Sequence, residues 1–192
     1  MTNFYDQNAQ TFFDATVNVE LPALWGAFLA ELPKHARILD AGCGSGRDAK
    51  YFGSLGHAVD AIDSSEAMCR RASEYIGIHV QRTRLQDLNV VGTYHGVWCC
   101  AAALHVPDAE LDDVLARLHR ALRSGGVCYL SFKLGTGERH DGARHFTDMT
   151  EEALRVRLRV LPGVNVVRLW TTHDARPDRA DEQWLNALSS VT

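Results

Sequence analysis

Three closely spaced glycines follow a short apolar segment near residue 40. Residues 37–41 read Arg-Ile-Leu-Asp-Ala, and Gly42, Gly44 and Gly46 come directly after them. This pattern predicts a buried strand that turns through the glycines into a helix. Glycines permit positive φ and let a ligand approach the backbone closely, and the first amide groups of a helix offer free N–H donors. The segment therefore predicts a ligand-binding turn.

Asp63 directly follows a second predicted strand, residues 57–62. In a doubly wound sheet, a carboxylate at this strand end lies beside the glycine turn and can accept two hydrogen bonds from the hydroxyls of a ribose. An ordinary glycine-rich turn requires no acid at this place. The turn and the acid together predict a ligand that contains a nucleoside.

The glycine spacing separates the classes of nucleoside ligand. A dinucleotide-binding turn has the pattern G-x-G-x-x-G, and Arg47 stands here at the position of its last glycine. This departure argues against a nicotinamide oxidoreductase. The sequence contains no G-x-x-x-x-G-K-[ST] segment, which excludes a P-loop.

The elements that must position these residues alternate between helix and strand along the chain. Alternation of this kind predicts an α/β fold with a doubly wound, mostly parallel seven-stranded sheet and helices on both faces, in three layers. A short, turn-rich link at residues 174–181 makes the last strand antiparallel to its neighbour. The strands are expected at residues 37–41, 57–62, 79–84, 96–101, 127–132, 165–171 and 183–189.

Capping residues and glycines set the limits of the later helices. Asp108 is expected to cap a helix that Gly125-Gly126 ends, and Thr150 to cap the next helix. Between the fifth strand and Thr150, residues 135–147 form a polar, glycine-containing stretch that predicts a long loop. Loops of this length in a compact domain are more often functional or mobile than structural.

Composition and charge exclude several protein classes. The chain has 192 residues and a net charge of −4, which predicts a single domain, 1–192, with no global attraction to nucleic acid. No apolar run approaches the ~20 residues of a membrane span, and the N-terminus lacks the pattern of a signal peptide. The five cysteines are odd in number and contain no C-x-x-C pair. A cytoplasmic protein without a disulfide framework or thiolate zinc site is expected.

The core motifs resemble those of class I S-adenosylmethionine-dependent methyltransferases. Residues 40–46, Asp-Ala-Gly-Cys-Gly-Ser-Gly, resemble motif I of that family, and residues 63–68 resemble its acidic loop after the second strand. The order continues through residues 104–106 and 122–126. Residues 42–48 and the short chain resemble the bacterial tellurite-resistance branch in particular. The resemblance implies a Rossmann-like methyltransferase fold and an enzyme of the transferase class.

This resemblance implies S-adenosylmethionine as the cofactor, with S-adenosylhomocysteine as its product. Carried over position by position, it assigns the methionine part and the ribose to the turn, the ribose hydroxyls and adenosine to the acidic loop, and the adenine edge to residues 84–87. It places the end of the fourth strand near the sulfonium. The implied cofactor residues are Asp40, Gly42, Gly44, Gly46, Asp63, Ser64, Met68, Gln86, Asp87 and Cys100.

The resemblance also implies that residues 1–20 form a lid over the cofactor, with Tyr5 as its main contact. The alternative is an amphipathic helix that packs on the sheet edge. The sequence leaves both open.

Methyl transfer from a sulfonium is an in-line displacement, so the enzyme mainly orients the acceptor in a dry site. Residues at the carboxyl ends of the later strands could do so, and a concentration of cations there predicts an anionic or otherwise nucleophilic small molecule. The candidates are His105, Lys133, Arg139 and Arg144, with His173, Asp174, Arg176 and Trp184 near the same mouth. Solvated loop charges remain the alternative reading.

Two further functions compete with a small-molecule methyltransferase. One is methyl transfer to tRNA or a peptide, and the other is a non-catalytic nucleoside-binding protein with the same fold. A metal site is not expected, because His140 and His145 lack an accompanying ligand set of recognisable spacing. The expected assembly is a monomer or a weak homodimer.

Overall fold

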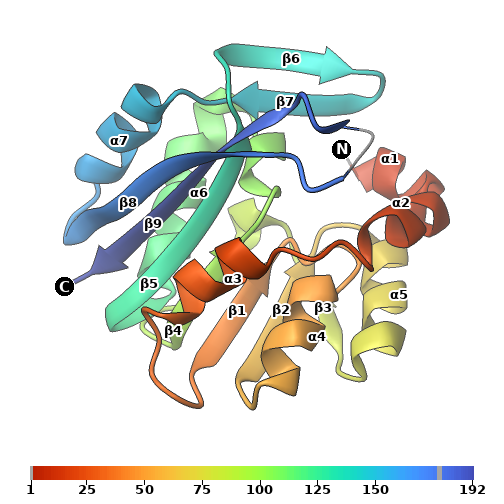
Figure 1. The fold of residues 1–192 in the computed structure, drawn as a ribbon, viewed down its shortest axis with the longest axis horizontal. Coiled ribbons are helices and arrows are strands. Elements are labelled where there is room, and N and C mark those ends of the chain that lie inside the picture. The colour runs from red at the N-terminus through yellow and green to blue at the C-terminus, as the bar shows by residue number, and fades with distance from the viewer. Residues whose placement is uncertain (1, 177–178) are drawn as a thin grey trace.

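A computed structural model describes residues 2–176 and 179–192 of the chain (Figure 1). Met1, at the start of the expected lid, and residues 177–178, within the expected turn, lie outside the described residues. One seven-stranded sheet organises the fold, and its strand order is β3-β2-β1-β4-β5-β9-β8. The strands are β1 (Arg37–Ala41), β2 (Ala58–Asp63), β3 (Val80–Arg82), β4 (Tyr94–Cys99), β5 (Leu122–Lys133), β8 (Val164–His173) and β9 (Gln183–Val191).

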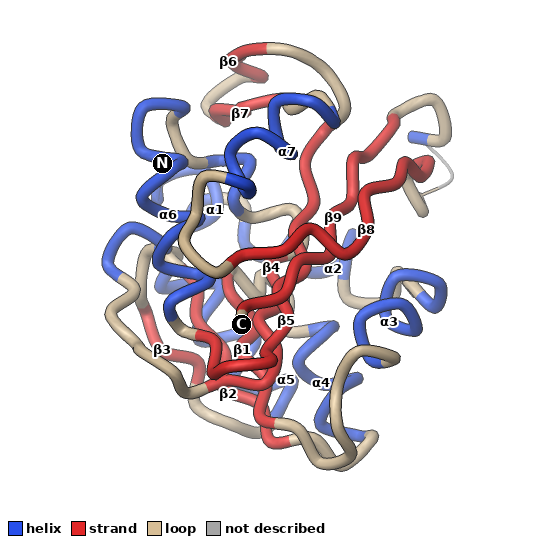
Figure 2. The backbone as a smooth tube through the Cα atoms, turned by 90° about the vertical axis from the view of Figure 1, so that its left-hand side faces the viewer, coloured by secondary structure: helices blue, strands red, loops and turns tan. Residues whose placement is uncertain are grey.

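The sheet is parallel from β3 to β5, and β9 pairs antiparallel with both β5 and β8. Helices cover both of its faces (Figures 1 and 2). One face packs on α3 (Pro22–Leu29), α4 (Arg47–Ser54) and α5 (Glu66–Ile76), and the other on α6 (Asp108–Arg120) and α7 (Glu151–Arg159). The predicted fold class is therefore confirmed.

Two short helices precede this core. The helices α1 (Thr2–Gln7) and α2 (Ala9–Thr16) lie beside the N-terminal end of α5, at the edge where β1 and β2 end (Figure 1). Short 3-10 turns follow β3 and β4, at Leu85–Asp87 and Ala103–His105. Within the described residues, no helix is long and apolar enough to cross a bilayer.

The stretch at residues 135–147 is not a loop. It forms the antiparallel hairpin of β6 (Gly137–Asp141) and β7 (Arg144–Asp148), which stands apart from the main sheet (Figure 1). Gly142 turns the chain with a φ of 59°. Asp141 pairs with Arg144, so Gly142 and Ala143 form a two-residue turn. A glycine at the first turn position is typical of one common hairpin turn, so Gly142 was the local signal for the hairpin.

Two predicted helix limits also differ from the structure. Helix α6 ends at Arg120, and Gly125 and Gly126 lie within β5, where the pairing with β4 shifts register. The amide of Asp108 is bound by Oε1 of Glu138 at 2.9 Å, so the hairpin caps α6 from outside. The cap of α7 is as predicted, because Oγ1 of Thr150 accepts the amide of Ala153 at 3.2 Å.

Candidate functional site

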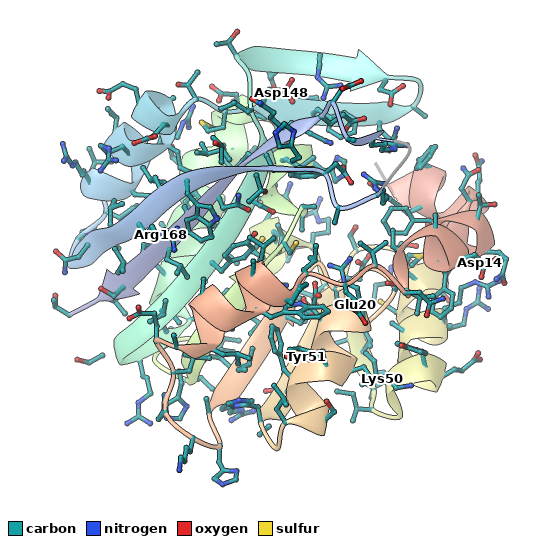
Figure 3. The ribbon with its side chains drawn as sticks, viewed as in Figure 1. Asp14, Glu20, Lys50, Tyr51, Asp148 and Arg168 are labelled. Atoms are coloured by element: carbon teal, nitrogen blue, oxygen red, sulfur yellow. The ribbon has the colours of Figure 1, made fainter. Side chains whose placement is uncertain are left out.

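A cavity of about 530 Å³ lies at the carboxyl ends of β1, β4 and β5. Its lining divides into two parts. The glycine half contains residues 42–45, 47–48 and 100–101, with Tyr5 and Phe12 from the N-terminal helices. The hairpin half is lined by Lys133, Arg139, Arg144, Phe146, Asp148, Asp174, Arg176 and Trp184, among others. Asp148 is seen at the base of the hairpin in Figure 3.

The glycine turn is fixed by its neighbours on three sides. The amides of Gly42 and Cys43 both donate to the carbonyl of Ile62 at 2.9 Å. Gly42 has a φ of +80°, and a Cβ there would lie 2.3 Å from Cβ of Ala102. A Cβ on Gly44 would meet only the ring of Phe12, at 3.3 Å. The turn therefore presents bare backbone to the cavity, with α2 above it.

Asp63 braces this turn. Its Oδ2 accepts the amide of Gly44 and its Oδ1 the amide of Ser65, each at 2.9 Å. Burial raises the pKa of Asp63, and the hydrogen bonds from Ser65 and Gly44 oppose that rise. The amide of Ser64 is a third backbone donor to this carboxylate. An ionised carboxylate has about four lone-pair sites, so acceptor capacity remains. The predicted association of the acid with the turn is present in the structure.

The other acidic-loop residues point in different directions. Ser64 and Asp87 line a second cavity of about 440 Å³ with Arg82, Thr83 and Arg84. Asp87 pairs with Arg84 at 2.6 and 2.8 Å, and this hydrogen bonding lowers its pKa.

Gln86 instead donates to Glu110 at 2.9 Å, and the side chain of Met68 is buried. Five of the predicted cofactor residues line neither cavity: Asp40, Gly46, Asp63, Met68 and Gln86. Asp40 accepts the amide of Ala49 at 3.0 Å, and Gly46 packs against Ile76.

The N-terminal helices are tied to both sides of the cavity. Asp6 accepts hydrogen bonds from Oγ of Ser65 at 2.5 Å and from the amide of Ala67 at 3.2 Å, at the start of α5. The hydroxyl of Tyr5 lies 2.7 Å from Nε2 of His105, and Nδ1 of His105 lies 2.7 Å from the carbonyl of His145 in β7. Tyr5 and His105 both line the cavity, as predicted for site residues.

A buried carboxylate that the sequence analysis did not single out lies behind the glycine half. Asp48 accepts the indole N–H groups of Trp25 and Trp98, each at 2.8 Å, and Nε and Nη2 of Arg47, also at 2.8 Å. Arg47, noted in the sequence only as a missing glycine, is thereby held at the cavity wall. Cys100 lies nearby as a neutral thiol, because burial raises its pKa to about 12.

The hairpin half brings together every candidate acceptor residue, but its cations are paired. Arg139 binds Asp148 at 2.5 Å and covers the ring of Phe146, and Arg144 pairs with Asp141. The described lining of the whole cavity holds six cations and six carboxylates: Arg47, Lys133, Arg139, Arg144, Arg176 and Arg179, and Asp48, Asp141, Asp148, Asp174, Asp181 and Glu182. The predicted surplus of cations is therefore wrong.

Lys133 shows how this pairing works. Its ammonium lies 3.3 Å from Oδ2 of Asp174, pairs with Glu182, and sits 3.9 Å above the ring of Trp184. Burial lowers the pKa of Lys133 to about 8, and the charge of Asp174 opposes the shift. Asp174 also accepts from Arg176 and from the indole of Trp184. The four residues expected near the cavity mouth all line the cavity: His173, Asp174, Arg176 and Trp184.

Among the described residues, no three histidine, cysteine, aspartate or glutamate side chains gather in a way that could hold a metal ion. His140 and His145 face each other across the hairpin with ring centroids 5.3 Å apart, and His145 is hydrogen-bonded to Glu138.

Comparison with known proteins links this geometry to a family. The model of the methyltransferase domain family matches residues 38–126, which include the glycine turn, Asp63 and β4. Over these residues the chain is similar to the methyltransferase domain family. Curated relatives of this chain are also methyltransferases. They support the resemblance of its core motifs to the class I S-adenosylmethionine-dependent methyltransferases.

The relatives match over about half of this chain. A malonyl-[acyl-carrier protein] O-methyltransferase from Enterobacter lignolyticus is 32% identical over 104 residues, 53% of this chain and 41% of its own length. A ubiquinone biosynthesis O-methyltransferase from Xanthomonas oryzae pv. oryzae is 30% identical over 103 residues, 50% of this chain and 42% of its own length. The chain thus spans about two fifths of these relatives.

Solved structures extend the match to the whole fold. A 1,6-didemethyltoxoflavin-N1-methyltransferase from Burkholderia thailandensis, with bound S-adenosylhomocysteine, has a TM-score of 0.83 at 23% identity, covering 100% of this chain and 87% of that one. A magnesium protoporphyrin IX methyltransferase from Synechocystis, with bound S-adenosylmethionine, has a TM-score of 0.69 at 20% identity, covering 99% and 85%. At these identities the likeness shows the fold of the methyltransferase domain.

Proposed function

We propose that this protein is an S-adenosylmethionine-dependent methyltransferase that acts on a small nucleophilic acceptor. One observation carries the proposal: a single cavity joins the bare backbone of the glycine turn to the side chains of the hairpin half. A donor of the methyl group and its acceptor can therefore meet within one cavity. The bound sulfonium would supply an already activated methyl group.

The residues present fit such a cofactor. Gly44 meets nothing but Phe12 above its Cα, and Asp63 keeps acceptor capacity for ribose hydroxyls while its two oxygens are oriented by backbone amides. Asp63 stands between the two cavities, because Gly44 lines one and Ser64 the other. We assign the methionine end to the glycine half and the adenine end to the cavity of Ser64 and Asp87.

The assignment of site residues follows from this placement. Gly42, Gly44, Tyr5, Cys100 and Arg47 would surround the methionine and sulfonium portion, whereas Asp40, Gly46 and Met68 would act from behind by holding the turn and α5. Gln86 would contribute to the adenine site through its place in the 3-10 turn beside Asp87. Lys133, Arg139 and Arg144 would enclose the acceptor, and His105 would help to position it through Tyr5, whose hydroxyl lies 2.7 Å away.

The acceptor cannot be taken from the relatives. The family match ends at residue 126, and Lys133, Asp148, Asp174 and Trp184 all lie beyond it. The balanced charge of the cavity lining removes the electrostatic reason for an anion. We therefore propose a nucleophilic acceptor and do not require that it carry a negative charge.

A small molecule suits this site better than a macromolecule. Enzymes that bind nucleic acid carry a basic face, and this chain has a net charge of −4 with its cavity arginines paired to carboxylates. A non-catalytic nucleoside-binding protein would have no need of a second, polar half in the same cavity. The tRNA, peptide and non-catalytic alternatives are therefore less well supported.

Isothermal titration with S-adenosylhomocysteine and with NAD tests the cofactor assignment. We expect binding of the first and none of the second. Transfer of a radiolabelled methyl group from S-adenosylmethionine to a small-molecule panel then tests activity. Binding of NAD in place of S-adenosylhomocysteine would refute the proposal.

A further inference from the structure

The pair formed by Tyr5 and His105 has a fixed hydrogen-bond polarity. Nδ1 of His105 faces the carbonyl oxygen of His145 at 2.7 Å, and a carbonyl oxygen can only accept. Nδ1 must therefore carry the ring hydrogen. In a neutral imidazole this leaves Nε2 without a hydrogen, so Nε2 can only accept. The 2.7 Å contact must then be donated by the hydroxyl of Tyr5.

The surroundings keep the imidazole neutral. His105 is tilted against the ring of Phe146 with centroids 4.8 Å apart and meets the ring of Tyr5 edge-on at 5.5 Å. Burial lowers its pKa to about 4, the hydrogen bond to His145 opposes this shift, and the charge of Arg144 reinforces it. Burial also raises the pKa of Tyr5 to about 12, so its hydroxyl keeps its proton at neutral pH.

The oxygen of Tyr5 therefore has no hydrogen to offer the cavity. Its single proton is committed to His105, and the guanidinium of Arg144 is hydrogen-bonded to the same oxygen. A hydroxyl oxygen has two lone pairs, so one remains. Tyr5 lines the cavity.

Tyr5 also lies at the junction of the two halves. The charges that act on it come from Asp63, beside the glycine turn, and from Arg144 and Arg176, in the hairpin half. Phe12, which covers Gly44, packs edge-on against its ring at 5.0 Å. A group bound by the Tyr5 oxygen would therefore be next to both the cofactor and the acceptor.

We infer that Tyr5 selects the methyl acceptor by accepting a hydrogen bond from its O–H or N–H group. The inference rests on the proposed methyltransferase function and narrows its substrate class to nucleophiles that carry such a hydrogen. An acceptor held in this way still has a lone pair to direct at the methyl group. A carboxylate or a fully substituted amine offers Tyr5 only lone pairs and is rejected. His105 is a positioning residue, because it acts on the acceptor only through Tyr5.

The direction of the hydrogen bond between Tyr5 and His105 can be measured without an activity assay. Long-range ¹⁵N NMR at pH 7, with the His105 signals assigned by their loss in His105→Gln, reports which ring nitrogen carries hydrogen. We expect hydrogen on Nδ1 and a bare Nε2. Hydrogen on Nε2, or on both nitrogens, would overturn the inference whether or not the protein binds S-adenosylhomocysteine.

Matched probes test the selection in protein saturated with S-adenosylhomocysteine. Phenol and aniline are compared with anisole and N,N-dimethylaniline, and benzoate serves as the anion, with binding followed by NMR shifts. We expect each donor-bearing probe to bind about fivefold more tightly than its methylated partner, the ratio that one neutral hydrogen bond supports. The preference should vanish in Tyr5→Phe and survive in Tyr51→Phe, a tyrosine outside the cavity lining.

The outcomes separate this inference from the proposed function. Equal binding within each pair, the absence of binding by all probes, tightest binding of benzoate, or an unchanged preference in Tyr5→Phe would each overturn it. Failure of the wild type to bind S-adenosylhomocysteine would instead overturn the proposed function. Titration of Tyr5→Phe with S-adenosylhomocysteine confirms that the variant is saturated when the probes are compared.

Discussion

The amide of Gly44 donates to Oδ2 of Asp63 over 2.9 Å, so the glycine turn and the acid nineteen residues later form one structural unit. Loss of the carboxylate affects that unit twice, since it removes the partner of a potential ribose and also releases the backbone of the turn. Release of the backbone of the turn should be measurable in the protein without a bound ligand.

Asp63→Ala should weaken binding of S-adenosylhomocysteine by at least tenfold, because hydrogen bonds to a charged group contribute about 1.5–3 kcal/mol each. Isothermal titration measures the affinity. Asp60→Ala is a matched control on the same strand, since Asp60 is partly exposed and pairs with Arg37. Similar affinities for the two variants would show that Asp63 is not the ribose acid.

Gly42→Ala should destabilise the protein more than Gly92→Ala does. Both glycines have positive φ, which costs an alanine about 1–2 kcal/mol. At Gly42 the added Cβ would also meet Cβ of Ala102 at 2.3 Å, whereas nothing lies within 4 Å of a Cβ at Gly92. Urea unfolding measures the difference, and equal losses would contradict the crowding at Gly42.

Asp48→Ala should be among the most destabilising substitutions in the chain. It leaves Arg47 charged at a partly buried position and the indole N–H groups of Trp25 and Trp98 without acceptors. Removal of one partner from a buried ion pair costs on the order of 3–5 kcal/mol. Chemical denaturation tests this, with Asp112→Ala on the exposed face of α6 as the control. A loss no larger than the control would refute the structural role of Asp48.

His105 should make stability depend on pH in acid. Its pKa is about 4 in the folded chain and 6.5 in the unfolded chain, so between these values the unfolded state binds more protons. The contribution is fully present above pH 6.5 and is lost as the pH falls towards 4, by on the order of 3 kcal/mol. Denaturation curves of wild type and His105→Gln should converge or cross in this window. Parallel pH profiles would contradict the shift.

Methyl transfer should persist in the presence of EDTA. The displacement needs no Lewis acid, and the histidines of the hairpin are engaged by Glu138 and by each other. Activity is measured with and without the chelator once an acceptor is found. Loss of activity that one divalent ion restores would show that the prediction is wrong.

The sequence carried the fold and the glycine half because both depend on local patterns. The turn at Gly42 and the acid at Asp63 are marked by residue type and by their place at strand ends, and parallel strands bring such ends together. The cap at Thr150 is equally local. Each of these predictions needed only a few neighbouring residues.

The pairing of charges could not be predicted in this way. Arg139 meets Asp148 because β6 and β7 pair in one register, and Lys133 meets Asp174 because β9 lies between β5 and β8. Neither register is a property of the isolated segments. A count of cations along the chain therefore overestimated the positive charge of the cavity.

The insertion of β9 between β5 and β8 has a consequence for synthesis of the protein. In the described residues, β8 pairs with β9 alone, so β8 leaves the ribosome before its partner exists. The strands from β1 to β5 can assemble earlier, because all of their parallel partners have been made once β5 is complete. Trp184, at the start of β9, can reach Lys133 only after β9 has been made. Nascent chains should thus form the glycine half of the cavity first and complete the hairpin half only after β9 has been made.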